Sequence, residues 1–437
     1  MKTFLHETSR RKIKQRAVMV GVYKKDEDGD SKDVVLDELA SLCRTAGATV
    51  VGKVTQFVDR YNPATLMGSG KADELSRIIG DSNANLIVFD TTLTPSQQVN
   101  LEKKLGVQAI DRPALILDIF AIHAKTREAR AQVELAQMQY ILPRLAGGWT
   151  HLERQEGAIG TRGPGETQLE TDRRLVRKRI ADLKKKLDDI EGERHTQRKG
   201  RVDFFNVCLV GYTNAGKSSM FNKLTGEHVT AEDYLFATLD SITRKLKLPR
   251  RNAILLSDTV GFIRRLPVSL VASFKSTLLE ASEADLLLHV IDISDEDFPE
   301  RIVTVSKILE EIGSGGIPLM PVFNKIDRIN NPDLYRNLLK QYPEAHFVSA
   351  ATGEGLSRLK DDLEIYMDRS HVTILATIDS NDSRGFGLLQ SLAYISEASS
   401  SDGITRLKAR LPAWRLGKLK SHGLEFRIEE GAGGPAR

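Results

Sequence analysis

A phosphate-binding pattern, G-x-x-x-x-G-K-[ST], occupies residues 211–218 and directly follows the apolar run at residues 204–210. Its glycines let backbone N–H groups point at a polyphosphate, and the helix expected next adds the positive end of its dipole. A glycine-rich turn without a ligand is the alternative, which the flanking strand and helix disfavour. We expect Lys217 to hold the β- and γ-phosphates and Ser218 to ligate Mg²⁺. The predicted loop comprises Gly211, Tyr212, Thr213, Asn214, Ala215, Gly216, Lys217, Ser218 and Ser219.

A second motif, D-x-x-G, comes at residues 258–261, at the end of an expected strand. Asp258 can hold the metal through water, and the N–H of Gly261 can turn towards a γ-phosphate. Thr238 lies in the loop before this strand, where its hydroxyl could complete Mg²⁺ coordination in the triphosphate state alone. The predicted contacts of this region are Thr238, Asp258, Thr259, Val260 and Gly261.

The choice of base is predicted by Asn324, Lys325 and Asp327, which follow the apolar strand at residues 317–323. The Asp327 carboxylate can accept from the N1–H and N2 amino groups of guanine, which adenine does not offer. Asn324 can serve the other base edge, the Lys325 stem can cover the ring, and Ser349 and Ala350 can supply a backbone N–H to guanine O6. These motifs, in this order, predict binding of GTP.

The residue after D-x-x-G is Phe262. Many GTPases place a Gln there to orient the attacking water, and a phenyl ring can neither orient water nor carry a proton. No catalytic residue can therefore be assigned. We expect slow intrinsic hydrolysis that rises when a partner completes the site.

The first 112 residues are expected to form a small parallel α/β domain. Two β-branched runs, at residues 17–23 and 49–54, enclose a segment of helical spacing, and a second strand and helix set follows up to residue 110. Gly68, Ser69, Gly70 and Lys71 resemble part of a phosphate loop, but a simple turn into a helix is favoured over an anion site.

A helical hairpin is expected next, over residues 113–200. Residues 114–145 have no interior proline before Pro143 and predict one long helix, and residues 169–199 predict its antiparallel partner. Residues 171–200 contain eleven Lys/Arg and six Asp/Glu, which gives a net charge of +5. This run is either a solvated helix face or an electrostatic footprint for phosphate.

The loop between these helices, residues 147–166, is rich in glycine and carries Trp149, Arg154 and Arg162. Arginines that pair with phosphates and rings that stack on bases suit irregular RNA. A disordered linker with solvated arginines is an equally good interpretation of this composition. The predicted RNA contacts are Arg154, Arg162, Arg173 and Arg174.

Composition adds few constraints. A net charge of +4 over 437 residues does not by itself indicate nucleic acid. Cys43 and Cys208 lie in apolar segments and are expected to be buried thiols. Residues 1–16 lack the apolar core of a secretory signal, and no run is long enough to span a membrane, so a cytoplasmic location is expected.

The whole chain is assigned to the α/β class, with a P-loop GTPase domain between two smaller parts. The expected domains are residues 1–112 (α/β), 113–200 (hairpin), 201–370 (GTPase) and 371–437 (small α+β domain). The tail at residues 431–435 is expected to be disordered.

The sequence resembles the HflX family of ribosome-associated GTPases. The resemblance rests on GYTNAGKS at residues 211–218, DTVGFI at 258–263, the base motif, and above all GTRGPGETQLETDRR at 160–174. It extends to about residue 370. One departure is Ala158, where the family tends to have glycine.

This resemblance implies binding to the large ribosomal subunit and its rRNA in the GTP state, with the hairpin directed at the peptidyl-transferase region. It implies the splitting of stalled ribosomes under stress, by a chain expected to be monomeric. In some K⁺-stimulated GTPases that the chain resembles, an Asn at the position of Asn214 helps to ligate K⁺; an Asn bonded to its own loop is the alternative. An RNA chaperone or assembly factor acting on free rRNA remains open as a second function. A regulatory GTPase without an RNA role is the third, which leaves the basic hairpin unexplained.

Overall fold

The structure is a computed structural model. It describes residues 14–25, 32–145, 164–198, 204–227, 235–236, 238–249, 253–264, 280–329, 332–369, 371–379, 382–401, 403–421 and 423–429. The chain divides into two compact units. Unit 1 comprises Met1–Glu191, Glu232–Asp240 and Ile263–Ser276, and unit 2 comprises the rest.

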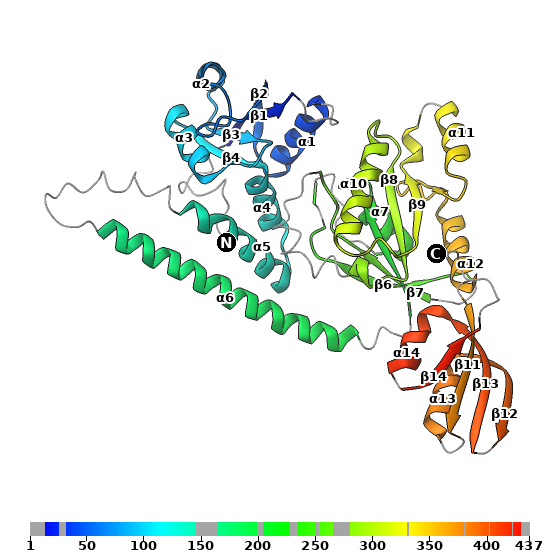
Figure 1. The fold of residues 1–437 in the computed structure, drawn as a ribbon. Coiled ribbons are helices and arrows are strands. Elements are labelled where there is room, and N and C mark those ends of the chain that lie inside the picture. The colour runs from blue at the N-terminus through cyan, green and yellow to red at the C-terminus, as the bar shows by residue number, and fades with distance from the viewer. Residues whose placement is uncertain are drawn as a thin grey trace. The chain divides into compact units, whose positions relative to one another are not determined.

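Unit 1 contains a parallel four-stranded sheet in the order β2-β1-β3-β4 (Figure 1). Its central strands are almost wholly apolar, as expected for strands that are covered on both faces. The sheet confirms the predicted parallel α/β fold. The strands are β1 (Arg16–Lys24), β2 (Thr49–Val58), β3 (Leu86–Phe89) and β4 (Gln108–Asp111).

The helices that connect these strands are α1 (Lys32–Thr45), α2 (Ser69–Ser82) and α3 (Pro95–Leu105). Helix α3 begins with a capping box, in which Thr94 and Gln97 satisfy each other's backbone N–H groups. Helix α2 begins directly after Gly68, and Lys71 forms an ion pair with Glu74 at 2.8 Å. This pairing fits the simple turn into a helix.

The prediction of one long helix over residues 114–145 is wrong. The segment forms two helices, α4 (Arg112–His123) and α5 (Arg127–Ile141), followed by the short helix η1 (Leu142–Arg144). The chain is extended at Ala124, and the Thr126 side chain accepts a hydrogen bond from the backbone N–H of Ala129, which caps α5. Helix α4 is buried on nearly every side and packs on α1, β3 and β4.

The hairpin partner is α6 (Pro164–Arg198), which runs beside α5 (Figure 1). Leu183, Ile180 and Leu187 of α6 pack against Ala131, Leu135 and Met138 of α5. Leu175 continues the same apolar stripe of α6 towards its N-terminus but is 57% exposed. The contact between the helices therefore uses only the part of the stripe around Leu183.

Unit 2 contains a six-stranded sheet in the order β10-β9-β8-β5-β7-β6, parallel except for β6. Apolar strands β5, β8 and β9 form its centre, and the carboxyl ends of parallel strands meet at one edge, where ligands usually bind. The strands are β5 (Phe205–Gly211), β6 (Ile242–Lys247), β7 (Ala253–Asp258), β8 (Leu286–Asp292), β9 (Leu319–Asn324) and β10 (His346–Phe347).

The helices described around this sheet are α7 (Lys217–Thr225), α10 (Phe298–Glu311), α11 (Pro332–Gln341) and α12 (Leu356–Arg369), with the short helix η4 (Ile326–Arg328) after β9. Met220, Phe221 and Leu224 of α7 enter the core with Leu359 and Leu363 of α12. This packing fixes the start of α7 next to the end of β5.

The C-terminal part of unit 2 is an antiparallel sheet in the order β12-β13-β11-β14, with helices between the strands (Figure 1). It confirms the predicted small α+β domain. Its elements are β11 (His371–Asp379), α13 (Ser383–Leu392), β12 (Tyr394–Ser401), β13 (Ile404–Pro412), η5 (Ala413–Arg415), α14 (Leu416–Ser421) and β14 (Glu425–Ile428).

Cys43 and Cys208 are free, buried thiols, as predicted. Burial raises the pKa of Cys43 to about 12. None of the helices in the described ranges combines the length and the apolar character needed to cross a bilayer. The expected disordered tail and residues 1–13 lie outside the described residues.

Candidate nucleotide-binding site

The P-loop connects the carboxyl end of β5 with the first residue of α7, as the sequence predicts. Gly216 has φ +90°, which favours glycine, and a Cβ there would lie 2.2 Å from Nδ2 of Asn324. The first helical residue is Lys217, so the free N–H groups of the α7 N-terminus open towards the loop. The loop thus has the geometry of an anion-binding turn.

Lys217 is buried, with 6% of its surface exposed. Its Nζ donates to the carbonyl oxygens of Gly211 at 3.1 Å and Tyr212 at 2.8 Å, both in its own loop. Burial lowers the pKa of Lys217 to about 8, and the nearby Asp258 charge opposes this only in part. The ammonium is therefore held in the loop with incomplete charge compensation.

Ser218 and Asp258 bring two oxygen ligands together. The Ser218 Oγ donates to Oδ2 of Asp258 at 2.6 Å, and Asp258 is fully buried at the end of β7. A hydroxyl beside a carboxylate is the oxygen donor set that Mg²⁺ takes, with phosphate and water completing its octahedron. The residues therefore fit Mg²⁺, which would neutralise phosphate charge there.

The D-x-x-G segment lies against the P-loop. A Cβ at Gly261 would lie 2.8 Å from Cα of Thr213 and 3.0 Å from Nζ of Lys217, so only glycine allows this approach. The backbone of Phe262 pairs with the loop, accepting from Thr213 N at 2.8 Å and donating to Gly211 O at 3.0 Å. Within the described residues, the buried Thr213 hydroxyl has no hydrogen-bond partner, which suits a site that a ligand completes.

The Phe262 side chain is 2% exposed. It is packed inside the protein, and it carries no group that could orient water. The geometry thus agrees with the expectation that this position does not supply the catalytic group.

Asn324 ends β9 and is 1% exposed. Its Nδ2 donates to the Ala215 carbonyl at 2.9 Å, and its Oδ1 accepts from the Ala350 N–H at 2.9 Å. We expected this amide to serve a base edge, but here both polar atoms join the P-loop to the loop after β10. Asn324 therefore fixes the distance between the phosphate and base regions.

Asp327 and Lys325 follow Asn324 and contact the same two loops, Lys325 the P-loop and Asp327 the loop after β10. The Asp327 carboxylate accepts from the Ser349 hydroxyl, a partner that a base could replace. The Lys325 Nζ donates to the Asn214 carbonyl at 2.8 Å and to Asp292 at 2.6 Å. Asp292 was not predicted from the sequence, although a carboxylate at the end of an apolar strand, here β8, was a usable signal.

Three family models match consecutive parts of the chain up to residue 325. Residues 33–121 match the GTP-binding GTPase N-terminal model, residues 123–201 the GTP-binding GTPase middle region, and residues 206–325 the model described as 50S ribosome-binding GTPase. The GTPase HflX of Magnetococcus marinus is 43% identical over 408 residues, covering 93% of this chain and 94% of that protein.

The Escherichia coli GTPase HflX is 42% identical over 410 residues, with 92% and 95% of the two chains covered. That of Flavobacterium psychrophilum is 51% identical over 313 residues, with 72% and 76% covered. The chain belongs to the HflX family of GTPases. Its P-loop domain is therefore that of a GTP hydrolase.

In this HflX-family chain, Thr238 belongs to unit 1 by its contacts, and it is buried. The segment is held on both sides of Thr238. Phe236 packs edge-on against Phe120 of α4, with ring centroids 4.7 Å apart, and Asp240 accepts hydrogen bonds from the backbone and side chain of Thr126. The role of Thr238 as a Mg²⁺ ligand in the triphosphate state stays a prediction.

Two polar networks in unit 1 of this HflX-family GTPase were not predicted from the sequence. In the first, Arg112 is 1% exposed and forms ion pairs with Asp90, at 2.8 Å, and with Glu38. It also donates to the carbonyl of Arg264 at 3.2 Å. These carboxylates raise the pKa of Arg112 despite its burial.

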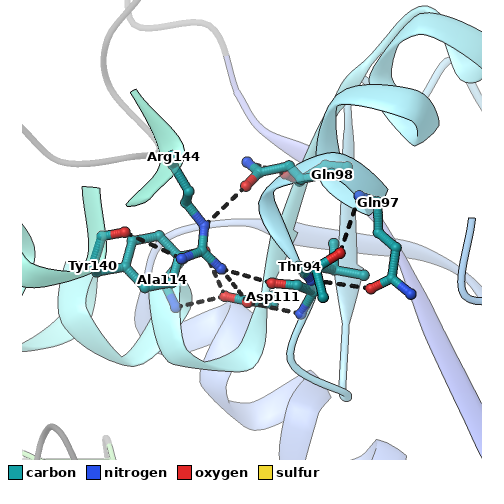
Figure 2. A network of polar contacts seen from close by, with 9 residues as sticks. Thr94, Gln97, Gln98, Asp111, Ala114, Tyr140 and Arg144 are labelled. Carbon is teal, nitrogen blue, oxygen red and sulfur yellow. Dashed lines mark hydrogen bonds and ion pairs between the residues drawn. The ribbon is translucent and has the colours of Figure 1, made fainter. Parts of the chain in front are cut away.

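The second network surrounds Asp111, the N-cap of α4 (Figure 2). Tyr140 donates to Asp111 at 2.8 Å, and Arg144 lies 3.3 Å from the same carboxylate while its guanidinium covers the Tyr140 ring. Burial is the largest influence on Asp111 and raises its pKa, and burial likewise raises the pKa of Tyr140. This network fastens the end of α5 and η1 to the sheet of unit 1.

The described residues include two of the four predicted RNA contacts. Arg154 and Arg162 lie outside the described residues. Arg173 and Arg174 lie on α6, with Arg174 exposed and Arg173 half-buried.

Proposed function

We propose that this HflX-family GTPase binds the large ribosomal subunit in its GTP state and splits stalled or idle ribosomes under stress. The observation that carries the proposal is the exposed basic surface of α6. Outside its contact with α5, this helix exposes Arg174, Arg177, Lys178, Lys184, Lys185 and Lys186. A long helix with this density of cations suits the phosphates of rRNA. The description of the matched GTPase model, 50S ribosome-binding, supports the same partner.

The proposed switch is the γ-phosphate. Mg²⁺ held by Ser218, through water by Asp258, and by Thr238 would neutralise the phosphates while Lys217 and the loop N–H groups bind them. The γ-phosphate draws in the N–H of Gly261, and its loss after hydrolysis releases both that segment and Thr238. The nucleotide thereby controls two segments of the chain at once.

The proposed intrinsic rate is slow, because Phe262 replaces the residue that usually orients water. Ribosome contact supplies or arranges the missing group. Full-speed hydrolysis by the purified protein without ribosomes would contradict this part. Asn214, at φ +61° on the loop, is the proposed ligand for K⁺, and equal rates in K⁺ and Na⁺ would remove it from that role.

The proposal is tested by sedimentation with purified ribosomes in sucrose gradients, comparing a non-hydrolysable GTP analogue with GDP. The expected result is co-migration with the large subunit and loss of intact ribosomes with the analogue only. The matched variants are Arg173→Ser/Arg174→Ser on α6 and Lys307→Ser/Lys340→Ser on α10 and α11, which remove the same charge elsewhere. Only the α6 variant should lose co-migration, and retained co-migration would contradict the role of the hairpin.

The second candidate is a GTP-dependent chaperone or assembly factor on free rRNA in the cytoplasm. The same basic helix favours it, since α6 does not distinguish free from assembled RNA. Binding to protein-free rRNA without association with finished subunits would favour this candidate. In that outcome only the GTPase activity of the first proposal would stand.

A further inference from the structure

The C-terminal sheet is covered by helices on one face only. Ile374, Ala376, Leu407 and Ala409 on that face share a core with Leu389 of α13, and Leu419 of α14 joins them. Because side chains alternate along a strand, the residues between these positions point to the opposite face. No described helix covers that open face, and its residues are largely exposed.

The open face carries a row of cations along a central strand. Arg406, Lys408 and Arg410 occupy three successive outward positions of β13. Arg406 lies between two hydroxyls, because β11 places Thr377 and β12 places Ser399 directly opposite it. The row therefore offers positive charge and hydrogen-bonding groups side by side.

The same face exposes apolar side chains. Tyr394 of β12 is paired with Arg410 and is 75% exposed, the most exposed large apolar side chain described. Leu375 of β11, paired with Lys408, is 42% exposed. Solubility alone does not require an exposed ring beside an arginine, whereas a stacking platform does.

Acidic groups compensate only the middle of the row. Lys408 forms an ion pair with Glu429 at 2.9 Å and has Glu397 opposite it on β12. Glu425 and Asp379 lie at other outward positions of the sheet. Within the described part of the chain, neither Arg406 nor Arg410 has an ion pair, so the two cations of the row that flank Lys408 are uncompensated, as is Arg427 of β14 on the same face.

We propose that this open face binds single-stranded RNA. A base stacks on Tyr394, the backbone phosphates contact Arg410 and Arg406, and the hydroxyls of Thr377 and Ser399 meet the ribose 2′-OH. Four-stranded sheets that stack bases on an open face are a known mode of RNA recognition, and this comparison is an analogy of architecture only. The residues of this site are all different from the basic residues of α6.

The test uses the full chain and a fluorescein-labelled dodecauridylate, with fluorescence anisotropy measured at several salt concentrations. Tyr394→Ala should weaken binding about tenfold, and Tyr394→Phe should keep it, because the ring provides the stacking. Arg406→Ser/Arg410→Ser should weaken binding. It should also reduce the slope of log affinity against log salt concentration by about the amount that two phosphate contacts contribute. Arg384→Ser, on helix α13 of the covered face, is the control and should behave as wild type.

Absence of dodecauridylate binding by the wild type, equal losses in the control and sheet variants, or equally tight binding of duplex RNA would overturn the proposal. Equal affinity for the matching deoxyribonucleotide would overturn the role of the 2′-OH. Preference for an acidic peptide would assign the face to a protein partner instead. Because Arg173→Ser/Arg174→Ser should leave this binding largely intact while abolishing ribosome co-migration, the two proposals fail independently.

Discussion

Two buried cations differ in how the protein compensates their charge. Among the described residues, Lys217 in unit 2 donates hydrogen bonds only to carbonyl oxygens of its own loop, and burial lowers its pKa to about 8. Arg112 in unit 1 is buried even more fully, yet its ion pairs with Glu38 and Asp90 raise its pKa. The protein supplies the counter-charge for Arg112, whereas for Lys217, which Asp258 compensates only in part, we propose that the phosphates of the nucleotide supply it.

The comparison separates a binding site from a structural site by electrostatics. An ammonium that burial pushes towards its neutral form gains when an anion arrives, so the cost of holding it is recovered on binding. A guanidinium that already has two carboxylates gains nothing from a further anion.

Arg112→Met should destabilise unit 1 by about 3–5 kcal/mol, because the buried Asp90 and the half-buried Glu38 lose their ion pairs with the guanidinium. The measurement is chemical denaturation of the ligand-free protein. The triple variant Glu38→Gln/Asp90→Asn/Arg112→Met should lose less, since no uncompensated charge remains. A triple variant that is less stable than the single one would show that the ion pairs are not the reason.

Lys217→Met should have the opposite effect on the ligand-free protein. A folded-state pKa of about 8, below the ordinary value of 10.5, means that folding opposes the charged form at neutral pH. Removing the charge should therefore stabilise unit 2 by about 2–3 kcal/mol. At the same time, affinity for GTP should fall at least about 100-fold, because the phosphates lose their buried cation.

Thermal unfolding without ligand and titration with a fluorescent GTP analogue give the two quantities for Lys217→Met. A variant that is destabilised and still binds GTP normally would reverse the assignment of the two cations.

Asp327→Asn should lower affinity for GTP about 100-fold and leave stability nearly unchanged, since among the described residues its carboxylate accepts only from the Ser349 hydroxyl. The amide presents one acceptor where the carboxylate presents two. Competition between GTP and ATP for the labelled analogue measures the loss of base choice. Asp333→Asn, at an exposed position of α11, is the matched control and should not change that choice.

The smallest effect is the pH dependence of GTP binding. Bound phosphate should raise the pKa of Lys217 above its ligand-free value of about 8. Affinity should therefore be steady below pH 8 and fall by up to about tenfold per pH unit above it, until the bound-state pKa is passed. Lys217→Met corrects for titration of the base, and its weaker affinity should lack this decline. The same decline in the variant would mean that Lys217 is not the titrating group.

The sequence predicted the P-loop and the parallel sheets well, because each depends on local features. Glycine spacing places the loop, and apolar runs bounded by polar residues give β5, β7 and β9. The break between α4 and α5 was missed because no proline marks it, and the absence of proline predicted one continuous helix. The local signal for the break is Thr126, which caps α5, and an N-cap residue is a weaker signal than a proline.

The polar networks could not be predicted in the same way. Glu38, Asp90 and Arg112 are far apart in the sequence, and only the folded sheet brings them together. The bonds of Asn324 to Ala215 and Ala350 likewise join three distant segments. Local patterns name the residue types of a site, but the partner of each side chain depends on tertiary structure.

We propose that occupancy of the nucleotide site controls attachment to the large ribosomal subunit. Coupling of this kind is reciprocal, so the subunit must change nucleotide affinity by the same factor. The decisive measurement is the affinity for a fluorescent non-hydrolysable GTP analogue, and for labelled GDP, with and without purified large subunits. We predict that large subunits raise the affinity for the analogue by about tenfold or more and leave the affinity for GDP unchanged. Equal affinities with and without subunits would contradict the account.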